Sequence, residues 1–152
     1  MNTPLQSVLV ANRGEIARRI FRTARSMGLR TVAVFADADT NAPFVADADE
    51  AVRLPDGYLD GDAVVAAALA TGSDAVHPGY GFLAENSGFA AAVEEAGLTW
   101  VGPSPSVIST MGDKLAAKEA AAAAGVPILP SSNDPTDDSP VNYPLLVKAT
   151  AG

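Results

Sequence analysis

Residues 7–16 read SVLVANRGEI. The first five of them form a short, unbroken apolar run, as expected for a strand that helices cover on both faces. A turn at residues 12–14 follows, and then a helical pattern begins that Gly28 ends. The apolar face of this helix is predicted to consist of Ile16, Ile20, Ala24 and Met27. Residues 31–36, TVAVFA, form a second unbroken run, so residues 7–36 are predicted to fold as a strand, a helix and a parallel strand.

The alternation of strands and helices continues through most of the chain. Further strands are expected at residues 51–54, 73–76 and 98–101, and further helices at residues 61–71 and 84–96. Alternation of this kind favours an α/β fold with a Rossmann-like, doubly wound parallel sheet.

Beyond residue 103 the pattern changes to helix alone. Ser104 is suited to cap a helix at residues 104–111, and a second helix is expected at residues 114–124. A brief extended segment, a polar loop with several prolines and a new strand are expected after them, at residues 126–130, 131–140 and 143–149. We interpret the two helices as a connector that leads away from the first sheet.

Composition and charge exclude several classes of function. The 18 acidic residues outnumber the 10 basic ones, and the net charge of -8 would on balance repel nucleic acid and anionic membrane surfaces. The chain has no cysteine, which excludes disulfides, thiolate zinc sites and a cysteine nucleophile. No apolar run approaches the ~18 residues of a membrane span, and the N-terminus has no signal-like segment. We expect a soluble, cytoplasmic protein.

The turn after the first strand allows two interpretations. Dinucleotide-binding sheets hold a pyrophosphate at this point, and Asp37, just after the second strand, lies about where such proteins bind a ribose hydroxyl. The turn contains one glycine, Gly14, where that fingerprint needs three. A tight turn with a capping Asn12 and an acidic loop explains the same residues. A nicotinamide-dinucleotide-binding domain of an oxidoreductase therefore stays open as an alternative.

The first helix also carries a stripe of arginines. Arg18, Arg22 and Arg25 recur at i, i+4 and i+7, and Arg19 lies three residues before Arg22. A solvent-exposed face is one explanation. The other is a contact between subunits, because the planar guanidinium group pairs well with carboxylates at interfaces. A non-enzymatic interaction module that uses this helix is a further alternative.

Residues 77–86 read HPGYGFLAEN and follow the strand expected at residues 73–76. His77 is the single histidine, and it lies at the carboxyl end of that strand, where open α/β sheets have their ligand crevice. Glycine alternates with aromatic residues after it, which allows close approach of the backbone beside apolar rings. The pattern predicts a loop that lines a ligand. Glu85 and Asn86 come at a helix start, where they could instead cap free N–H groups.

Residues 143–152 read YPLLVKATAG. An apolar strand that ends in Lys148 and opens into a small-residue turn is typical of the point where a glycine-rich loop cradles nucleotide phosphates. Lys114 ends an earlier motif, MGDK at residues 111–114. An ammonium group near a transferring phosphate neutralises charge, although most lysines simply face water.

Four of these segments occur in the same order as in a known protein family. ANRGEI at residues 11–16, HPGYGFLAEN at 77–86, MGDK at 111–114 and the Lys148 segment together resemble the start of a biotin carboxylase. The resemblance implies an ATP-dependent ligase that carboxylates biotin on a carrier protein with bicarbonate. By the same resemblance the site residues fall into three groups: Lys114 and Lys148 at ATP, Tyr80, Gly81 and Glu85 in the cleft for biotin and bicarbonate, and Arg19 and Arg22 at a dimer interface.

The resemblance further implies two domains, several cofactors and several partners. Residues 1–112 would form the N-terminal Rossmann-like domain, and residues 113–152 a helical connector and the truncated start of an ATP-grasp domain. ATP, Mg²⁺ or Mn²⁺, bicarbonate and biotin are expected, together with a biotin carboxyl carrier protein or domain, a carboxyltransferase subunit and a second copy of the domain. Catalytic residues and metal ligands are expected beyond Gly152. Residues 1–152 alone should therefore be inactive. The carboxyltransferase would select the final acceptor, an acyl-CoA, pyruvate or urea.

Overall fold

The computed structural model describes residues 4–130 and Pro144. The chain divides into two compact units, residues 1–108 and residues 109–152. The first unit holds a sheet with its helices, and the second follows it in the chain. The domain boundary expected after residue 112, and with it the ATP-grasp assignment, stays a prediction.

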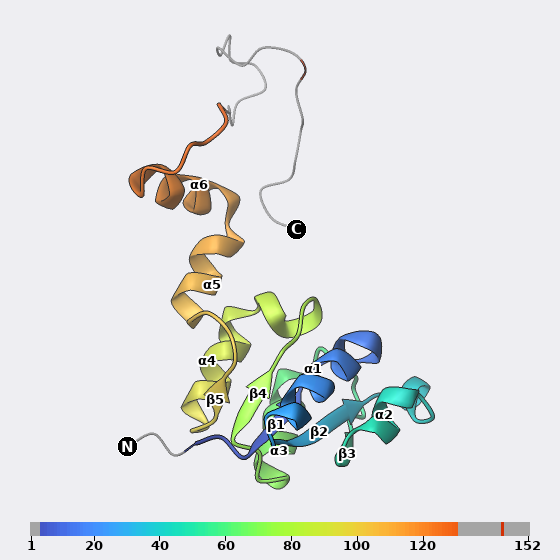
Figure 1. The fold of residues 1–152 in the computed structure, drawn as a ribbon. Coiled ribbons are helices and arrows are strands. Elements are labelled where there is room, and N and C mark those ends of the chain that lie inside the picture. Colours follow the sequence, from blue (N-terminus) through green and yellow to red (C-terminus); the bar gives the residue numbers. More distant parts are fainter. Residues whose placement is uncertain (1–3, 131–143, 145–152) are drawn as a thin grey trace. The chain divides into compact units, whose positions relative to one another are not determined.

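A five-stranded parallel sheet forms the centre of the first unit (Figure 1). In chain order its strands are β1 Ser7–Val10, β2 Arg30–Phe35, β3 Glu50–Arg53, β4 Ala75–His77 and β5 Thr99–Trp100. Across the sheet the order is β3-β2-β1-β4-β5, and every neighbouring pair is parallel. The central β1 is buried along its whole length, whereas β3 at one edge is mostly exposed. The parallel sheet predicted from the sequence is confirmed.

Helices cover both faces of this sheet. They are α1 Gly14–Ser26, α2 Pro43–Asp47, α3 Gly61–Ala70 and α4 Ser87–Glu95, with short 3₁₀ turns η1 Asp37–Asp39 and η2 Phe82–Glu85. Successive residues of β1 point to opposite faces. Leu9 lies in a core with residues of α3 and α4, and Val10 lies in a core with residues of α1 and α2. The sheet is therefore doubly wound, as the unbroken apolar runs predicted.

The buried face of α1 differs from the predicted one. Its buried residues are Ala17, Phe21 and Ala24. Of the residues expected there, Ile16 and Ile20 are half-buried, and Met27 is 69% exposed. The prediction was right for Ala24 and wrong for Met27, because two sets of positions in this helix satisfy the i+3 and i+4 spacing, and the large ring of Phe21, 1% exposed, decides between them.

Gly28 ends α1, as expected. The Gly28 N–H donates to the Arg25 carbonyl at 2.9 Å, and the Leu29 N–H donates to the Ala24 carbonyl at 3.0 Å. This pair of bonds is a Schellman motif, and Gly28 supplies the positive φ, 78°, that the motif requires. Met27, the residue before this turn, is the C-cap of α1 and is exposed.

Two local features were not predicted. The short helix α2 places Phe44 in the core beneath α1, where it is 1% exposed. The helix expected at residues 84–96 is divided into η2 and α4. The division occurs because the Asn86 side chain accepts the Phe89 N–H at 2.9 Å and so starts a new helix, which confirms the capping role considered for Asn86.

The helices expected after residue 103 are present as α5 Pro105–Gly112 and α6 Lys114–Ala123. The Ser104 hydroxyl accepts the Val107 N–H at 3.4 Å at the start of α5. Asp113 is the N-cap of α6, because its carboxylate accepts two backbone N–H bonds at 2.8 and 2.9 Å. The strand expected at residues 143–149 lies outside the described residues. In the described part of the chain, no helix combines the length and the apolar character needed to cross a membrane.

We expect Phe21→Ala to lower the free energy of unfolding by about 3–5 kcal/mol, because it empties a fully buried site between α1 and the sheet. Met27→Ala should change it by less than about 0.5 kcal/mol, since that side chain faces solvent. Urea denaturation followed by circular dichroism measures both values. An equal decrease in the free energy of unfolding in the two variants would indicate that Met27 is part of the core face, and would contradict the observed packing.

Candidate ligand-binding site

The topological switch point of the sheet lies between β1 and β4. From the central β1 the chain winds to β2 on one side and later to β4 on the other, so the loops that follow β1 and β4 are neighbours at the carboxyl edge. The Ala11 N–H donates to the His77 carbonyl at 2.9 Å, which extends the pairing of these strands into their loops. Open α/β sheets bind their ligands in the crevice at such a point.

Asn12 joins the two loops. Its side chain is fully buried, and Nδ2 donates to the Pro78 carbonyl at 2.8 Å and to the Tyr80 carbonyl at 2.9 Å. Its Oδ1 accepts the Arg13 N–H at 2.9 Å, so both ends of the carboxamide are satisfied. The expectation that Asn12 caps the first helix is therefore wrong: Arg13 occupies the N-cap position of α1, and its side chain makes no capping bond. Asn12 instead satisfies carbonyl groups of a loop distant in sequence.

The loop after β4 approaches α1 so closely that only glycine fits at position 79. Gly79 has a φ of 68°, and a Cβ there would lie 2.7 Å from Ile16 Cγ2 and 2.8 Å from Asn12 Nδ2. The Gly79 N–H donates to Nδ1 of His77 at 3.0 Å. Burial lowers the pKa of His77, which favours the neutral ring that can accept this bond. His77 therefore orders the first turn of the loop.

Tyr80 and Gly81 form the exposed part of the same loop. Tyr80 is 57% exposed, and its hydroxyl donates to Glu15 Oε1 at 2.5 Å. The hydrogen bond to this carboxylate raises the pKa of Tyr80. Gly81 is exposed, and Glu85 is exposed at the last residue of η2. The structure presents these three predicted site residues to solvent beyond the switch point, and their contact with biotin or bicarbonate stays a prediction.

A cluster of Arg13, Asp39 and Tyr58, which was not predicted, joins further loops at this edge. Asp39 is 7% exposed, and its Oδ2 accepts from Nε of Arg13 at 2.7 Å and from the Tyr58 hydroxyl at 2.5 Å. Nη2 of Arg13 completes a two-point ion pair with the other oxygen. The bonds from Arg13, and then from Tyr58, lower the pKa of Asp39 despite its burial. The guanidinium group also lies over the Tyr58 ring, 5.9 Å from its centroid.

Asp37 does not have the environment expected of a ribose-binding acid. Nη2 of Arg53 donates to Asp37 Oδ2 at 2.8 Å, a second bond comes from Nε, and this pairing lowers the pKa of Asp37. Two acids follow β2, and the buried one is Asp39, two positions beyond the one considered. The sequence signals a pair of acids here, but it does not signal which of them is buried. Nothing at this edge favours the nicotinamide alternative.

The two lysines expected at ATP are only partly covered by the structure. Lys114 is the first residue of α6, in the second unit, and Lys148 lies outside the described residues. Their contact with ATP stays a prediction. Within residues 4–130, no group of three or more histidine, cysteine or acidic side chains could hold a metal ion.

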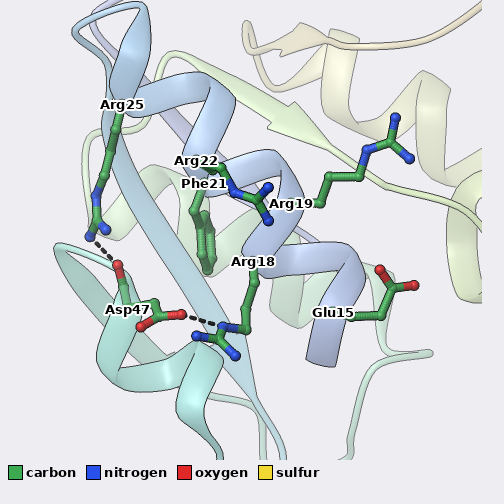
Figure 2. Close-up of a pocket in the computed structure, with 7 residues that line it drawn as sticks. All are labelled: Glu15, Arg18, Arg19, Phe21, Arg22, Arg25 and Asp47. Atoms are coloured by element: carbon green, nitrogen blue, oxygen red, sulfur yellow. Dashed lines mark hydrogen bonds and ion pairs between the residues drawn. The ribbon is translucent and has the colours of Figure 1, made fainter.

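The arginines of α1 divide into two pairs around an open pocket of about 650 Å³ (Figure 2). Arg18 bonds to the Asp47 carboxylate, and Arg25 bonds to the Asp47 carbonyl oxygen. Neither Arg19 nor Arg22 makes a hydrogen bond or ion pair with any residue that the structure describes. Figure 2 shows Arg19 extending away from Asp47. The stripe predicted from the sequence thus consists of two arginines that hold α2 and two that face outward.

Comparisons with known proteins identify relatives of this chain. The family described as "Biotin carboxylase, N-terminal domain" matches residues 4–108. The chain is 49% identical to the mitochondrial methylcrotonoyl-CoA carboxylase subunit alpha of Oryza sativa subsp. japonica, over 97% of this chain and 22% of that protein. It is 45% identical to the biotin carboxylase of Pseudomonas aeruginosa, over 97% of this chain and 36% of that protein.

Solved structures share the fold. The biotin carboxylase domain dimer of the Hydrogenobacter thermophilus 2-oxoglutarate carboxylase, in complex with MgADP, ADP and bicarbonate, has a TM-score of 0.83 and 46% identity. The match covers 87% of this chain and 30% of that one. A single-chain, multi-domain long-chain acyl-CoA carboxylase has a TM-score of 0.82 and 51% identity, with coverage of 87% and 14%.

The sheet is parallel and doubly wound, and an exposed loop of glycine and aromatic residues lies at its switch point. These features define an α/β domain of the ligand-binding kind. The family match extends through both loops of that switch point. The chain belongs to the family of biotin carboxylase N-terminal domains. It spans 22% and 36% of the lengths of the two curated relatives named above. The family inferred from the sequence motifs is confirmed.

Replacing Gly79 and Gly81 with alanine should distinguish the cost of a steric clash with α1 from the cost of backbone strain. Both glycines have a positive φ, 68° and 74°, so alanine strains the backbone at each. At position 81 the new Cβ meets nothing within 4 Å, but a φ of 74° with a ψ of -170° is a region essentially restricted to glycine, so we expect Gly81→Ala to cost about 1–3 kcal/mol of unfolding free energy. Gly79→Ala also forces the loop away from α1 and should cost about 1–3 kcal/mol more. Urea denaturation provides the comparison, and equal costs would contradict the close fit at position 79.

Proposed function

We propose that this chain is the N-terminal region of an enzyme that carboxylates biotin with ATP and bicarbonate. The observation that carries the proposal is the family match over residues 4–108, which includes both loops of the switch point. The Hydrogenobacter relative was solved with MgADP and bicarbonate, which are a product and a substrate of such a reaction. Because the chain spans only part of each relative, the activity is assigned to the assembled enzyme.

The exposed loop after β4 is proposed to line the cleft for biotin and bicarbonate. The Tyr80 ring offers an apolar surface for a small heterocycle, and Gly81 offers a backbone without a side chain in the way. The donor of the Tyr80 hydroxyl is already used by Glu15, so the ring rather than the O–H is proposed to contact the ligand. Glu85 adds a carboxylate at the exposed end of η2.

Lys114 and Lys148 are proposed to contact the phosphates of ATP. A lysine ammonium group is a compact charge that partly neutralises a phosphate. Bound ATP with Mg²⁺ or Mn²⁺ supplies the phosphoryl group that activates bicarbonate. The rest of the enzyme is proposed to hold the metal ion.

The proposed partners are a biotin carboxyl carrier protein or domain, a carboxyltransferase and a second copy of this domain. Support comes from the relatives, one of which is a multi-domain carboxylase in a single chain and another a biotin carboxylase domain dimer. The relatives are named for different acceptors, methylcrotonoyl-CoA, 2-oxoglutarate and long-chain acyl-CoA. The proposal therefore covers the carboxylation of biotin and leaves the final acceptor to the partner.

A chimera tests the proposed activity. In it, this chain replaces the matching N-terminal region of the P. aeruginosa biotin carboxylase. We expect ADP release that depends on bicarbonate and free biotin, and none from this chain alone, because phosphoryl transfer needs phosphate and metal contacts that the rest of the enzyme supplies. A folded chimera without this activity would contradict the proposal.

Two lysine variants of the chimera separate nucleotide binding from a general effect of charge. Lys148→Met should raise KM for ATP by about tenfold or more, because a charge-assisted contact is lost. Lys118→Met is the matched control, since Lys118 donates to the Leu129 carbonyl of the same unit at 3.3 Å, and it should leave KM for ATP unchanged.

The outward pair of arginines is proposed to form part of a dimer interface. Arg19→Glu with Arg22→Glu should convert a dimeric chimera to monomers with native circular dichroism, because repulsion would replace attraction across a self-complementary surface. Arg18→Glu with Arg25→Glu carries the same charge change but disrupts bonds to α2, so it should lower stability and leave the dimer constant unchanged. Sedimentation of both variants, at protein concentrations near the dissociation constant, measures the fraction of dimer. An undisturbed dimer in the first variant would assign Arg19 and Arg22 to a solvent-exposed face.

A further inference from the structure

Phe82 has an unusual backbone conformation for its residue type. In the part of the chain that the structure describes, it is the one residue other than glycine with a positive φ, at 46°. Bulky side chains disfavour this region, so such a conformation persists only where the surroundings hold it. The Phe82 ring packs on the ring of Tyr58. The two rings are stacked, with centroids 5.2 Å apart and planes inclined by 24°.

Tyr58 is itself fixed through its hydroxyl. The hydroxyl donates to buried Asp39 at 2.5 Å and accepts the Ala36 N–H at 3.2 Å. Arg13 holds Asp39 through a two-point ion pair, and its guanidinium group lies over the Tyr58 ring. The Tyr58 ring is therefore attached to the segments that directly follow β1, the central strand, and its neighbour β2.

We propose that Tyr58, oriented by Asp39, is a positioning residue that holds the ligand loop of residues 79–82 in shape by stacking on Phe82. Asn12 fixes the beginning of this loop through backbone carbonyls, and Tyr58 fixes its end. The exposed side chain of Tyr80 and the exposed Gly81 are thus held by an anchor on each side, Asn12 at the carbonyls of Pro78 and Tyr80 and Tyr58 at Phe82. We call the stacked pair of Tyr58 and Phe82, with the hydrogen bonds of Tyr58, the brace. The brace is inferred from these contacts, and only the identity of the ligand, biotin, rests on the proposed function.

Hydrogen exchange of the Ala84 amide tests the brace in this chain. The Ala84 N–H donates to the Gly81 carbonyl at 3.0 Å and closes the turn that contains Phe82. Tyr58→Leu removes the aromatic ring and should speed exchange at Ala84 by roughly two- to tenfold, the range that the loss of an aromatic pair allows. The Ala96 amide, which donates to the Ala92 carbonyl in α4, should exchange as in the parent and so exclude a global effect.

Two further variants make the test specific. Tyr58→Phe keeps the ring and should restore Ala84 exchange to within about twofold of the parent, because the stack with Phe82 remains. Leu59→Ala alters the neighbouring side chain, which is 68% exposed, and should change neither amide. Unchanged exchange at Ala84 in Tyr58→Leu overturns the proposal, and so do equal effects of Tyr58→Leu and Tyr58→Phe. If Tyr58→Leu does not fold, Phe82→Leu, which removes the other ring of the stack, decides instead: faster exchange at Ala84 alone supports the brace, and parent-like exchange overturns it.

The chimera distinguishes the brace from the identity of the ligand. Tyr58→Leu in the chimera should raise KM for biotin by roughly two- to tenfold and leave KM for ATP unchanged, because only the loop of residues 79–82 is loosened. Faster exchange at Ala84 with an unchanged KM for biotin upholds the positioning role of Tyr58 and counts against biotin as the ligand of this loop.

Discussion

The buried carboxamide of Asn12 is the interaction on which the carboxyl edge of the sheet depends. A tight loop packed against a helix leaves backbone carbonyls where water does not reach, and each unsatisfied one would cost about 1–3 kcal/mol. Asn12 satisfies the carbonyls of Pro78 and Tyr80 from the end of the neighbouring strand. The absence of a side chain at Gly79 lets the loop approach closely enough for these bonds to form.

The fold could be predicted from the sequence because its signals are local. An unbroken apolar run, a turn and a helix ended by Gly28 each draw on residues near one another in the chain, and the structure agrees with them. The site could be predicted only in part, because its contacts join distant residues. Asn12 bonds across 66 and 68 positions, and a residue before a helix looks like a cap unless the partner loop is known. Asp39 and Tyr58 are 19 positions apart, in a contact that no periodicity signals.

The arginine stripe shows how one missed element affects a neighbouring prediction. Helical spacing correctly grouped Arg18, Arg22 and Arg25, but spacing does not say which of them another segment will meet. The short helix α2 decides this, because Asp47 at its end engages Arg18 and Arg25 and leaves Arg22 outside. A five-residue helix has too few positions for a recognisable period, so the division of the stripe was not accessible without the structure.

The edge strand β3 has a consequence for the behaviour of the protein in concentrated solution. One side of this strand pairs with β2, and an unpaired strand edge is a template for aggregation with other chains. Charged residues lie at both ends of β3, Glu50 with Arg30 at 2.7 Å and Arg53 with Asp37. A strand added at this edge would have to displace water from these charges, which opposes edge-to-edge growth. The charges at its two ends thereby guard this edge against fibrous association.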